Sequence, residues 1–267
     1  MRKTALITGA TSGIGLELCR VFARNGYNLV LVARDEDKLT RVARELEAES
    51  RISIQTIARD LSSPSSAQEV FNQTLSLGIQ VDVLVNNAGA GLNGFFIENE
   101  YEDEMAIIQL NIASLAAFCH LFGKEMAKRG AGRILNVAST AAFQPGPLMS
   151  NYYASKAYVF MLSEGLRNEL KKSGVVLTTL CPGPTQTGFF ERANMKNTVI
   201  AHVPYLMRPE KVAEIGYAAL MRGKKVVIAG VFNQLLALST RLSPRGVLIN
   251  IARFLNQRRP SWTSLNA

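Results

Sequence analysis

The sequence contains few of the residues that build metal centres and disulfide frameworks. It has two histidines, His120 and His202, and three cysteines that lie far apart in the chain. This count excludes a histidine-rich metal centre, and we expect no metal site. Sparse, unpaired cysteines are typical of buried thiols in a reducing cytosol. The sequence also lacks a Gly-x-Ser-x-Gly turn, which argues against a serine hydrolase.

Long apolar runs are also lacking. The short run after Lys3 breaks at Gly9, too soon for the hydrophobic region of a signal peptide. No apolar stretch reaches the ~18 residues that a membrane-spanning helix needs. The longest, around residues 226–238, is interrupted by Asn233 and Gln234. The composition, 48% apolar and 19% charged in 267 residues, is ordinary for a soluble globular protein. We therefore expect a cytoplasmic protein.

Acidic residues are scarce near the C-terminus. Between positions 208 and 259 there are ten basic and two acidic residues, so most of the net charge of +9 lies in that segment. The rest of the chain is nearly neutral. This distribution argues against a protein built around nucleic acid, which needs a basic face on its main domain.

A glycine-rich turn, Thr8–Gly15, follows the first short apolar run and precedes a helical pattern that extends to Asn25. A strand, a glycine turn and a helix in this order form a cradle for phosphate, because glycine lets the backbone approach the anion and the helix N-terminus supplies N–H groups. Gly9, Gly13 and Gly15 do not follow the Gly-x-Gly-x-x-Gly spacing. The turn alone is therefore weak evidence, and a purely structural turn is an equal alternative.

Apolar runs and helical patterns alternate along the chain. Such alternation predicts a parallel sheet covered by helices on both faces, an α/β fold of the doubly wound Rossmann type, in a single domain. The predicted strands are 3–8, 29–33, 52–58, 82–86, 133–138, 175–181 and 225–229, with 185–207 expected to be irregular. Ligands of such sheets sit outside the carboxyl ends of the strands.

Tyr152 and Lys156 lie four residues apart in a predicted helix that extends to about Lys172. Residues at this spacing share a helix face, with Cβ atoms ~5–6 Å apart. A nearby ammonium group lowers the pKa of a phenol from its usual ~10, which would make the tyrosine a better acid or base. The pair alone is weak evidence, because many helices carry it on their surface.

Several motifs in order resemble the classical short-chain dehydrogenase/reductase family. They are the Thr8–Gly15 turn, Asp60, Asn86-Asn87-Ala88-Gly89, Asn111, Ser139, Tyr152 with Lys156, and Pro182-Gly183 followed by Thr187. The resemblance covers residues 1–230, the expected dinucleotide-binding and catalytic domain. Residues 231–267 are an amphipathic basic extension of the same domain.

The resemblance implies four catalytic residues. Tyr152 would be the general acid/base, with Lys156 lowering its pKa, Ser139 holding the substrate oxygen and Asn111 ordering a water. Asn111 could instead cap or kink its helix. Tyr153 is a neighbouring phenol, but one residue turns it ~100° away from Lys156.

The resemblance also implies a nicotinamide cofactor, which carries the hydride chemistry. The cofactor-binding residues would be Gly9, Thr11, Ser12, Gly13, Ile14, Gly15, Arg34, Asp60, Leu61, Asn87, Ala88, Gly89, Tyr152, Lys156, Pro182, Gly183, Thr185 and Thr187. At the end of the second strand, Arg34 stands near the position where NAD-binding proteins place an acid. Because a guanidinium pairs well with phosphate, we expect NADP(H) rather than NAD(H).

The segments expected to wall the substrate are apolar, which suits a hydrophobic ketone or alcohol such as an acyl chain or a steroid. They are Leu92, Phe95, Phe96, Ile97, Phe143, Leu148, Met149, Phe189, Phe190, Met195, Val199 and Ile200. Some of these side chains could equally pack the core.

Three functions remain open. The first is an NADP(H)-dependent oxidoreductase of a secondary alcohol and ketone, and the second a catalytically silent NADP(H)-binding sensor or scaffold. The third is an isomerase or dehydratase. Family resemblance implies a homodimer or homotetramer with a small-molecule substrate. The basic extension could be a subunit interface or core cap, a substrate lid, or a peripheral contact with anionic membrane.

Overall fold

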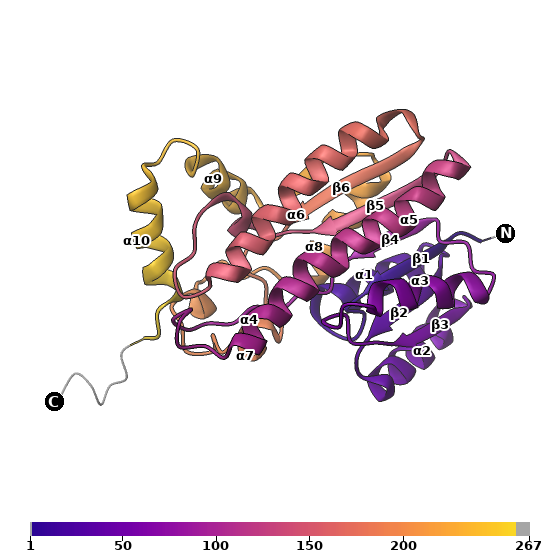
Figure 1. Ribbon diagram of the computed structural model, residues 1–267, viewed down its shortest axis with the longest axis horizontal. Helices are drawn as coiled ribbons and strands as arrows, with labels where there is room; N and C mark the ends of the chain where they lie inside the picture. Colours follow the sequence, from indigo (N-terminus) through magenta and orange to yellow (C-terminus); the bar gives the residue numbers. More distant parts are fainter. Residues whose placement is uncertain (1, 260–267) are drawn as a thin grey trace.

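A seven-stranded parallel sheet forms the centre of the computed structural model, which describes residues 2–259 (Figure 1). Its strand order is β3-β2-β1-β4-β5-β6-β7. The strands are β1 (Thr4–Thr8), β2 (Asn28–Ala33), β3 (Ile54–Ala58), β4 (Val83–Asn86), β5 (Gly132–Val137), β6 (Val175–Cys181) and β7 (Val226–Ile228). The order reverses between β1 and β4, and ligands of such sheets bind in the crevice at that point. The α/β doubly wound fold expected from the sequence is confirmed.

Helices cover both faces of this sheet, and further helices lie beyond one end of it. They are α1 (Gly13–Arg24), α2 (Glu36–Ser50), α3 (Ser66–Ser76), α4 (Tyr101–Ile108), α5 (Leu115–Arg129), α6 (Ser150–Glu169), α7 (Phe189–Arg192), α8 (Pro209–Met221), α9 (Val231–Ser239) and α10 (Arg245–Asn256). A π-helical turn (Gln109–Ser114) joins α4 to α5, and three short 3-10 turns span Thr140–Phe143, Leu170–Lys172 and Ile200–His202.

Two hydrophobic clusters hold these layers together. On one face, α1, α2 and α8 pack on the sheet around Phe22, which is fully buried. On the other face, α3, α5 and α6 pack around Phe118 and Met126. The central strands are buried on both sides, which explains their continuous apolar runs. Each fully buried side chain of this size stabilises the fold by roughly 1.5–3 kcal/mol.

One sequence expectation about apolar length was wrong. The continuous helix Tyr101–Arg129 is long and apolar enough, by length and composition, to cross a membrane. The search for an uninterrupted apolar run missed it because a spanning segment tolerates a few polar residues. In the fold, Phe118, Phe122 and Met126 of this helix pack against the sheet, so we interpret it as a core helix.

Element boundaries differ from the sequence expectations in small ways. β3 begins at Ile54 rather than at residue 52, and the segment expected to be irregular contains α7 and a 3-10 turn. α9 ends at Ser239 and α10 begins at Arg245, with Ser243-Pro244 in the turn between them. These last two helices form a pair at one end of the molecule, far from the N-terminus (Figure 1).

Candidate active site

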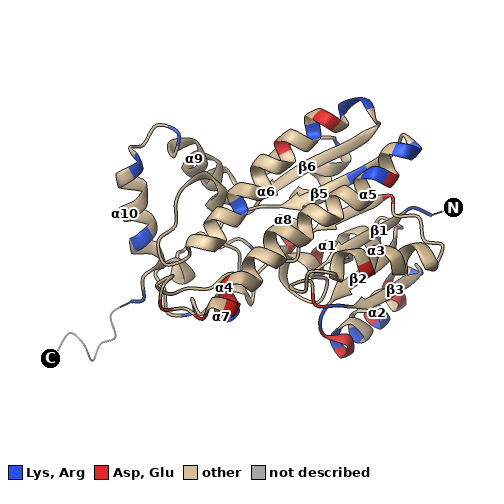
Figure 2. Cartoon of the chain, viewed as in Figure 1, with Lys and Arg blue, Asp and Glu red and all other residues tan. Residues whose placement is uncertain are grey.

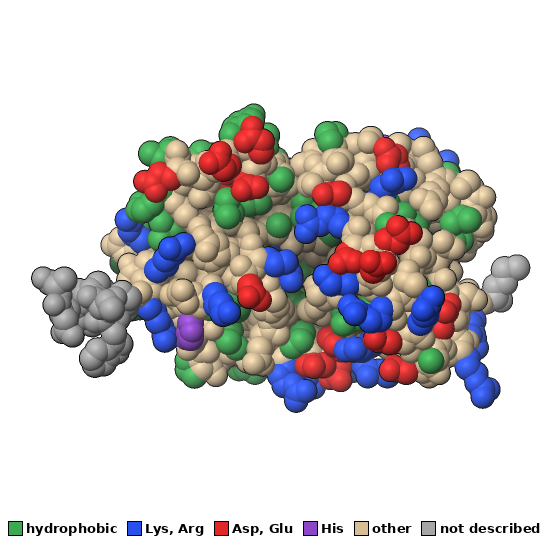
Figure 3. Space-filling model, turned by 90° about the horizontal axis from the view of Figure 1, so that it is seen from below, with side chains coloured by type: hydrophobic (Ala, Val, Ile, Leu, Met, Phe, Trp, Pro, Cys, Tyr) green, Lys and Arg blue, Asp and Glu red, His purple; other side chains and the backbone are tan. Residues whose placement is uncertain are grey.

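A cavity of about 840 Å³ lies at the carboxyl ends of the strands. Figure 3 shows a hollow on the face of the molecule that is seen from below, with Lys and Arg side chains at its rim. Every residue predicted to bind cofactor lines this cavity, and so do Ser139, Tyr152 and Lys156. Asn111 is the one predicted site residue outside its lining. The fold therefore gathers residues from six separate strand ends into one site.

The glycine turn before α1 is shaped for a phosphate group. Gly9 has a φ of +68°, a conformation that favours glycine. A Cβ on Gly15 would collide with the Gly9 carbonyl and the Asn87 side-chain amide. The Ser12 side chain makes no capping hydrogen bond to α1, so the N–H groups of the first helical turn remain available. The turn fits the pyrophosphate of a dinucleotide.

The side chains of the Asn-Asn-Ala-Gly segment at the end of β4 face two different regions, the core and the cavity. Asn87 Nδ2 donates to the Thr8 carbonyl at 2.9 Å, and Thr8 Oγ1 accepts from the backbone N–H groups of Asn87 and Ala88, each at 3.0 Å. These bonds tie the end of β4 to the end of β1. Asn86 turns inward and donates to Asn136 Oδ1 at 2.9 Å. Asn87 and Ala88 are thereby held at the cavity wall.

Asn111 lies in the π-helical turn, behind the cavity wall. Its Oδ1 accepts from the Ala90 N–H at 2.9 Å, and its Nδ2 donates to the Ala90 carbonyl at 2.8 Å and to Ser155 Oγ at 2.9 Å. Gly89 separates it from the lysine, because a Cβ there would lie 3.3 Å from Lys156 Nζ and 3.4 Å from Asn111 Oδ1. Asn111 thus fixes the backbone that carries Gly89 and Ala90. π-Helical turns are frequent at functional sites.

The other three predicted catalytic side chains come from β5 and α6. Ser139 follows β5, where its Oγ accepts from the Ala141 N–H at 3.1 Å and donates to the Pro182 carbonyl at 3.4 Å. Tyr152 and Lys156 lie in the first turns of α6. Lys156 is only 5% exposed, and its Nζ donates to the Val137 carbonyl at 3.0 Å. The same Nζ lies 5.8 Å from the centre of the Tyr152 ring.

The expected effect of Lys156 on the tyrosine is not what the structure shows. Burial raises the pKa of Tyr152 to about 12, and the Ser139 hydroxyl opposes this shift. The Lys156 amine is directed to the Val137 carbonyl instead of the phenol. Burial also lowers the pKa of Lys156 to about 8, with the nearby Cys181 thiol opposing that shift. At neutral pH the phenol therefore keeps its proton.

We expect Lys156→Met to raise stability while it abolishes turnover. The pKa of Lys156 falls from 10.5 to about 8 on folding, so the buried cation costs roughly 3 kcal/mol below pH 8. Loss of the bond to Val137 offsets part of this, so the gain in unfolding free energy at pH 7 is about 1–3 kcal/mol. Thermal unfolding then shows a midpoint several degrees higher.

The difference in stability between Lys156→Met and the unsubstituted protein should depend on pH. Between pH 8 and 10.5 the unfolded lysine binds more protons than the folded one, so stability of the unsubstituted protein rises with pH in that window. The advantage of Lys156→Met should shrink over the same range. A variant that melts below the parent at pH 7 would contradict the cost assigned to the buried cation.

The end of the cavity near β2 and β3 carries four basic side chains, which are Arg34, Lys38, Arg41 and Arg59. The carboxylate of Asp35 is already paired with Lys38, because it accepts from the Lys38 N–H at 3.0 Å and lies 2.8 Å from Lys38 Nζ. The Asp60 carboxylate accepts from Ser62, and Arg34 lies 3.9 Å away. The sequence reasoning found only Arg34 and missed the other three cations. Lys38 and Arg41 lie four and seven residues after Arg34, and Arg59 directly follows β3, the strand paired with β2. These positions were the available signal.

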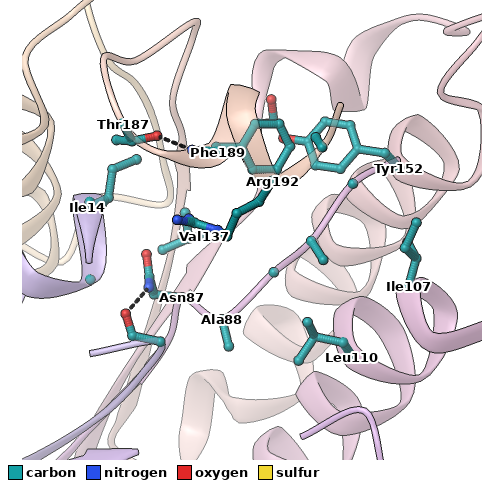
Figure 4. A pocket seen from close by; sticks show the side chains of 18 of the residues that line it. Ile14, Asn87, Ala88, Ile107, Leu110, Val137, Tyr152, Thr187, Phe189 and Arg192 are labelled. Carbon is teal, nitrogen blue, oxygen red and sulfur yellow. Dashed lines mark hydrogen bonds between the residues drawn. The ribbon is translucent and has the colours of Figure 1, made fainter. Parts of the chain in front are cut away.

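Figure 4 shows the opposite end, where Tyr152 and Phe189 lie side by side and Arg192 extends its guanidinium into the space between them and Val137. The Tyr152 and Phe189 ring centres are 5.1 Å apart. Six of the predicted substrate residues line the cavity: Leu92, Met149, Phe189, Phe190, Met195 and Ile200. The other six, Phe95, Phe96, Ile97, Phe143, Leu148 and Val199, are outside its lining. Phe95, Phe96 and Ile97 are exposed, and Phe143 packs against Phe160.

Sequence reasoning also missed two polar residues of the cavity, Arg192 and Asn256. Asn256, at the end of α10, is fully buried and donates through Nδ2 to the Pro147 carbonyl at 3.0 Å. Its own carbonyl accepts from Asn93 at 2.8 Å, and its side chain lies 3.4 Å from the Tyr153 hydroxyl. The second phenol, Tyr153, is thus engaged with the C-terminal extension rather than with Lys156. The extension closes one end of the cavity.

Comparison with known families decides the classification. The model of the short chain dehydrogenase family matches residues 3–198, a span that contains the glycine turn, Ser139, Tyr152 and Lys156. The chain belongs to this family. Oxidoreductase chemistry with a nicotinamide cofactor is the activity of this family, and the cavity fits such a cofactor.

Known members resemble the chain over most of its length. A very-long-chain 3-oxoacyl-CoA reductase from Danio rerio is 33% identical over 184 residues, which are 67% of this chain and 58% of that protein. A short-chain dehydrogenase from Sphingobium yanoikuyae, solved with NADPH, is 31% identical with a TM-score of 0.80 and covers 90% of this chain and 94% of its own. A member from Burkholderia phymatum, solved with NAD, is 25% identical with a TM-score of 0.80, covering 97% and 98%.

Proposed function

We propose that the protein is an NADP(H)-dependent oxidoreductase that interconverts an apolar ketone and its secondary alcohol. The observation that carries this proposal is the convergence of Ser139, Tyr152 and Lys156 on one cavity whose other end is the glycine turn. A cofactor with its pyrophosphate at that turn would reach toward the tyrosine. Proline and threonine residues after β6, including Thr187, border the space between the two ends.

The side chains of the site divide the work of carbonyl reduction. NADPH, when bound, supplies the hydride. The neutral Tyr152 phenol donates a proton to the carbonyl oxygen, and Ser139 donates a hydrogen bond to the same oxygen. Lys156, whose amine donates to the Val137 carbonyl, would bind the ribose next to the nicotinamide. Because burial keeps the phenol protonated near neutral pH, the site is prepared to give a proton to a ketone oxygen.

The preference for NADP(H) rests on charge at the cavity end near β2. Arg34, Lys38, Arg41 and Arg59 line it, and the carboxylate of Asp35 is held by Lys38. A ribose 2′-phosphate would meet a cationic surface there, whereas a ribose 2′-hydroxyl would lack the acid that NAD sites provide. The NADPH-bound relative from Sphingobium yanoikuyae supports this proposal.

An apolar substrate is proposed from the other end of the cavity. Met149, Phe189, Phe190 and Met195 form an apolar wall beside Tyr152. Such a wall favours a long acyl or steroid-like ketone over a small sugar. The similarity to a very-long-chain 3-oxoacyl-CoA reductase points in the same direction.

A panel of ketones tests the proposal directly. Acyl, steroid and small sugar ketones are each mixed with the protein and NADPH or NADH, and nicotinamide absorbance is followed. We expect the apolar ketones to oxidise NADPH faster than NADH, and faster than the sugars do. Tight NADPH binding without oxidation by any ketone would instead identify a catalytically silent cofactor-binding protein.

A further inference from the structure

We infer that α9 and α10 form a docking surface for anionic phospholipid. These helices bury only one side against the protein, through residues such as Asn233, Ala237, Leu248 and Ala252. Their other sides carry large apolar side chains, 39–87% exposed, which we call the C-terminal surface: Val231, Phe232, Leu235, Leu236, Leu238, Leu242, Val247, Ile249, Ile251 and Phe254. Exposed apolar surface on this scale marks an interaction site.

The apolar side chains of α10 form an ordered stripe. Val247, Ile251 and Phe254 recur at the spacing of one helix face, and they are 48%, 49% and 56% exposed. α9 carries no charged residue at all, and its exposed Leu235 and Leu238 continue the apolar surface toward Leu242 in the turn between the two helices. This arrangement is typical of a helix pair that lies in a membrane interface.

The charge around the C-terminal surface is of one sign. From position 215 to position 259 the chain has eight basic residues and no acidic one. Five of them are arginines in or next to α9 and α10: Arg241, Arg245, Arg253, Arg258 and Arg259. None of these arginines has a salt-bridge partner within residues 2–259. In Figure 2 every charged residue on this helix pair is basic.

This charge distribution selects the partner. In a symmetric dimer the same surface contacts itself, so arginines would face arginines with no carboxylate between them. A layer of anionic lipid offers phosphates to the arginines and acyl chains to the leucines. Nucleic acid would satisfy the charge but leave the aliphatic stripe exposed. An anionic lipid surface satisfies both features.

Acidic residues mark the limit of this surface. The Arg253 guanidinium lies 5.7 Å from the ring centre of Phe95, and Glu98, Glu100 and Glu102 follow Phe95 along the chain. These carboxylates would be repelled by anionic lipid. The contact is therefore centred on α9 and the turn at Leu242 rather than on the loop before α4.

Vesicle co-sedimentation of the full chain tests this inference. Vesicles of phosphatidylcholine with about 30% phosphatidylglycerol are compared with pure phosphatidylcholine, at low salt and at about 0.5 M salt. We expect binding to the anionic vesicles at low salt and at least tenfold weaker binding at high salt or without the anionic lipid. Equal binding to both vesicle types, or none to anionic vesicles at low salt, would overturn the inference.

Paired variants separate lipid docking from self-association. Arg241→Gln with Arg245→Gln should weaken vesicle binding about 30-fold, from about fivefold for each arginine. Leu238→Ser with Leu242→Ser, at side chains 57% and 87% exposed, should weaken it about tenfold or more and leave ketone turnover in free solution unchanged.

The matched controls lie at the other end of the molecule. Leu75→Ser with Leu77→Ser, at side chains 53% and 48% exposed, and Lys171→Gln with Lys172→Gln should bind vesicles like the parent. Sedimentation equilibrium without lipid gives the competing outcome. A dimer that disappears in the Leu238→Ser, Leu242→Ser variant would assign the C-terminal surface to a second copy and overturn the lipid proposal.

Discussion

Tyr152→Phe is expected to lower kcat for ketone reduction by ~10²–10⁴-fold, because the change removes the only proton that the phenol can donate. The variant keeps the ring, which lies 5.1 Å from the Phe189 ring, so the cavity wall remains intact. The dissociation constant of NADPH, measured by fluorescence titration, should change by less than about threefold. Removal of one oxygen atom thereby distinguishes an effect on turnover from an effect on cofactor binding.

Tyr158→Phe is the matched control. Tyr158 lies on the same helix but is 39% exposed and outside the cavity lining. It should turn over like the parent protein. Full activity in Tyr152→Phe, or an equal loss in both variants, would show that Tyr152 is not the proton donor.

Arg34→Asp is expected to shift the cofactor preference toward NAD(H). The change removes a guanidinium that lies at this end of the cavity, 3.9 Å from the Asp60 carboxylate, and supplies a carboxylate that accepts from a ribose hydroxyl. A charge-assisted hydrogen bond contributes about 1.5–3 kcal/mol, so the ratio of kcat/KM for NADPH to that for NADH should fall by about 10²-fold or more. Steady-state kinetics with both cofactors measure this ratio.

Arg44→Asp supplies the control for that experiment. Arg44 is an exposed residue of α2 outside the cavity lining, so the same charge reversal should leave the ratio within about threefold of the parent. An unchanged ratio in Arg34→Asp would reject the assignment of the phosphate site to this end of the cavity.

The parts of the site that follow from local sequence were predictable. Gly9 and Gly15 mark the turn because a Cβ fits neither the φ of one nor the surroundings of the other. Ser139 follows its strand directly, and Tyr152 and Lys156 share the start of one helix. Parallel strands bring all these positions to one edge of the sheet. The alternation of strands and helices and the spacing of the motifs were therefore sufficient to predict that these residues share one site.

The parts that depend on long-range packing were not predictable. Lys156 was expected to lower the pKa of the Tyr152 phenol. Its amine instead donates a hydrogen bond to the Val137 carbonyl, because a buried cation needs an acceptor. Asn256 enters the cavity from a helix more than a hundred residues beyond Tyr153. The π-helical turn that aims Asn111 at Ala90 has no signature in the apolar pattern. Each outcome is decided by partners that are remote in sequence.

The central claim is that one cavity holds the cofactor with its reactive ring beside Tyr152 and Ser139. A crystal structure of the protein with NADP⁺ and an apolar alcohol tests it most directly. We expect the pyrophosphate at the N-terminus of α1, the 2′-phosphate at Arg34, and the alcohol oxygen within ~2.6–3.2 Å of the Tyr152 hydroxyl. A cofactor bound in the reverse direction, or an alcohol oxygen out of reach of Tyr152, would contradict it.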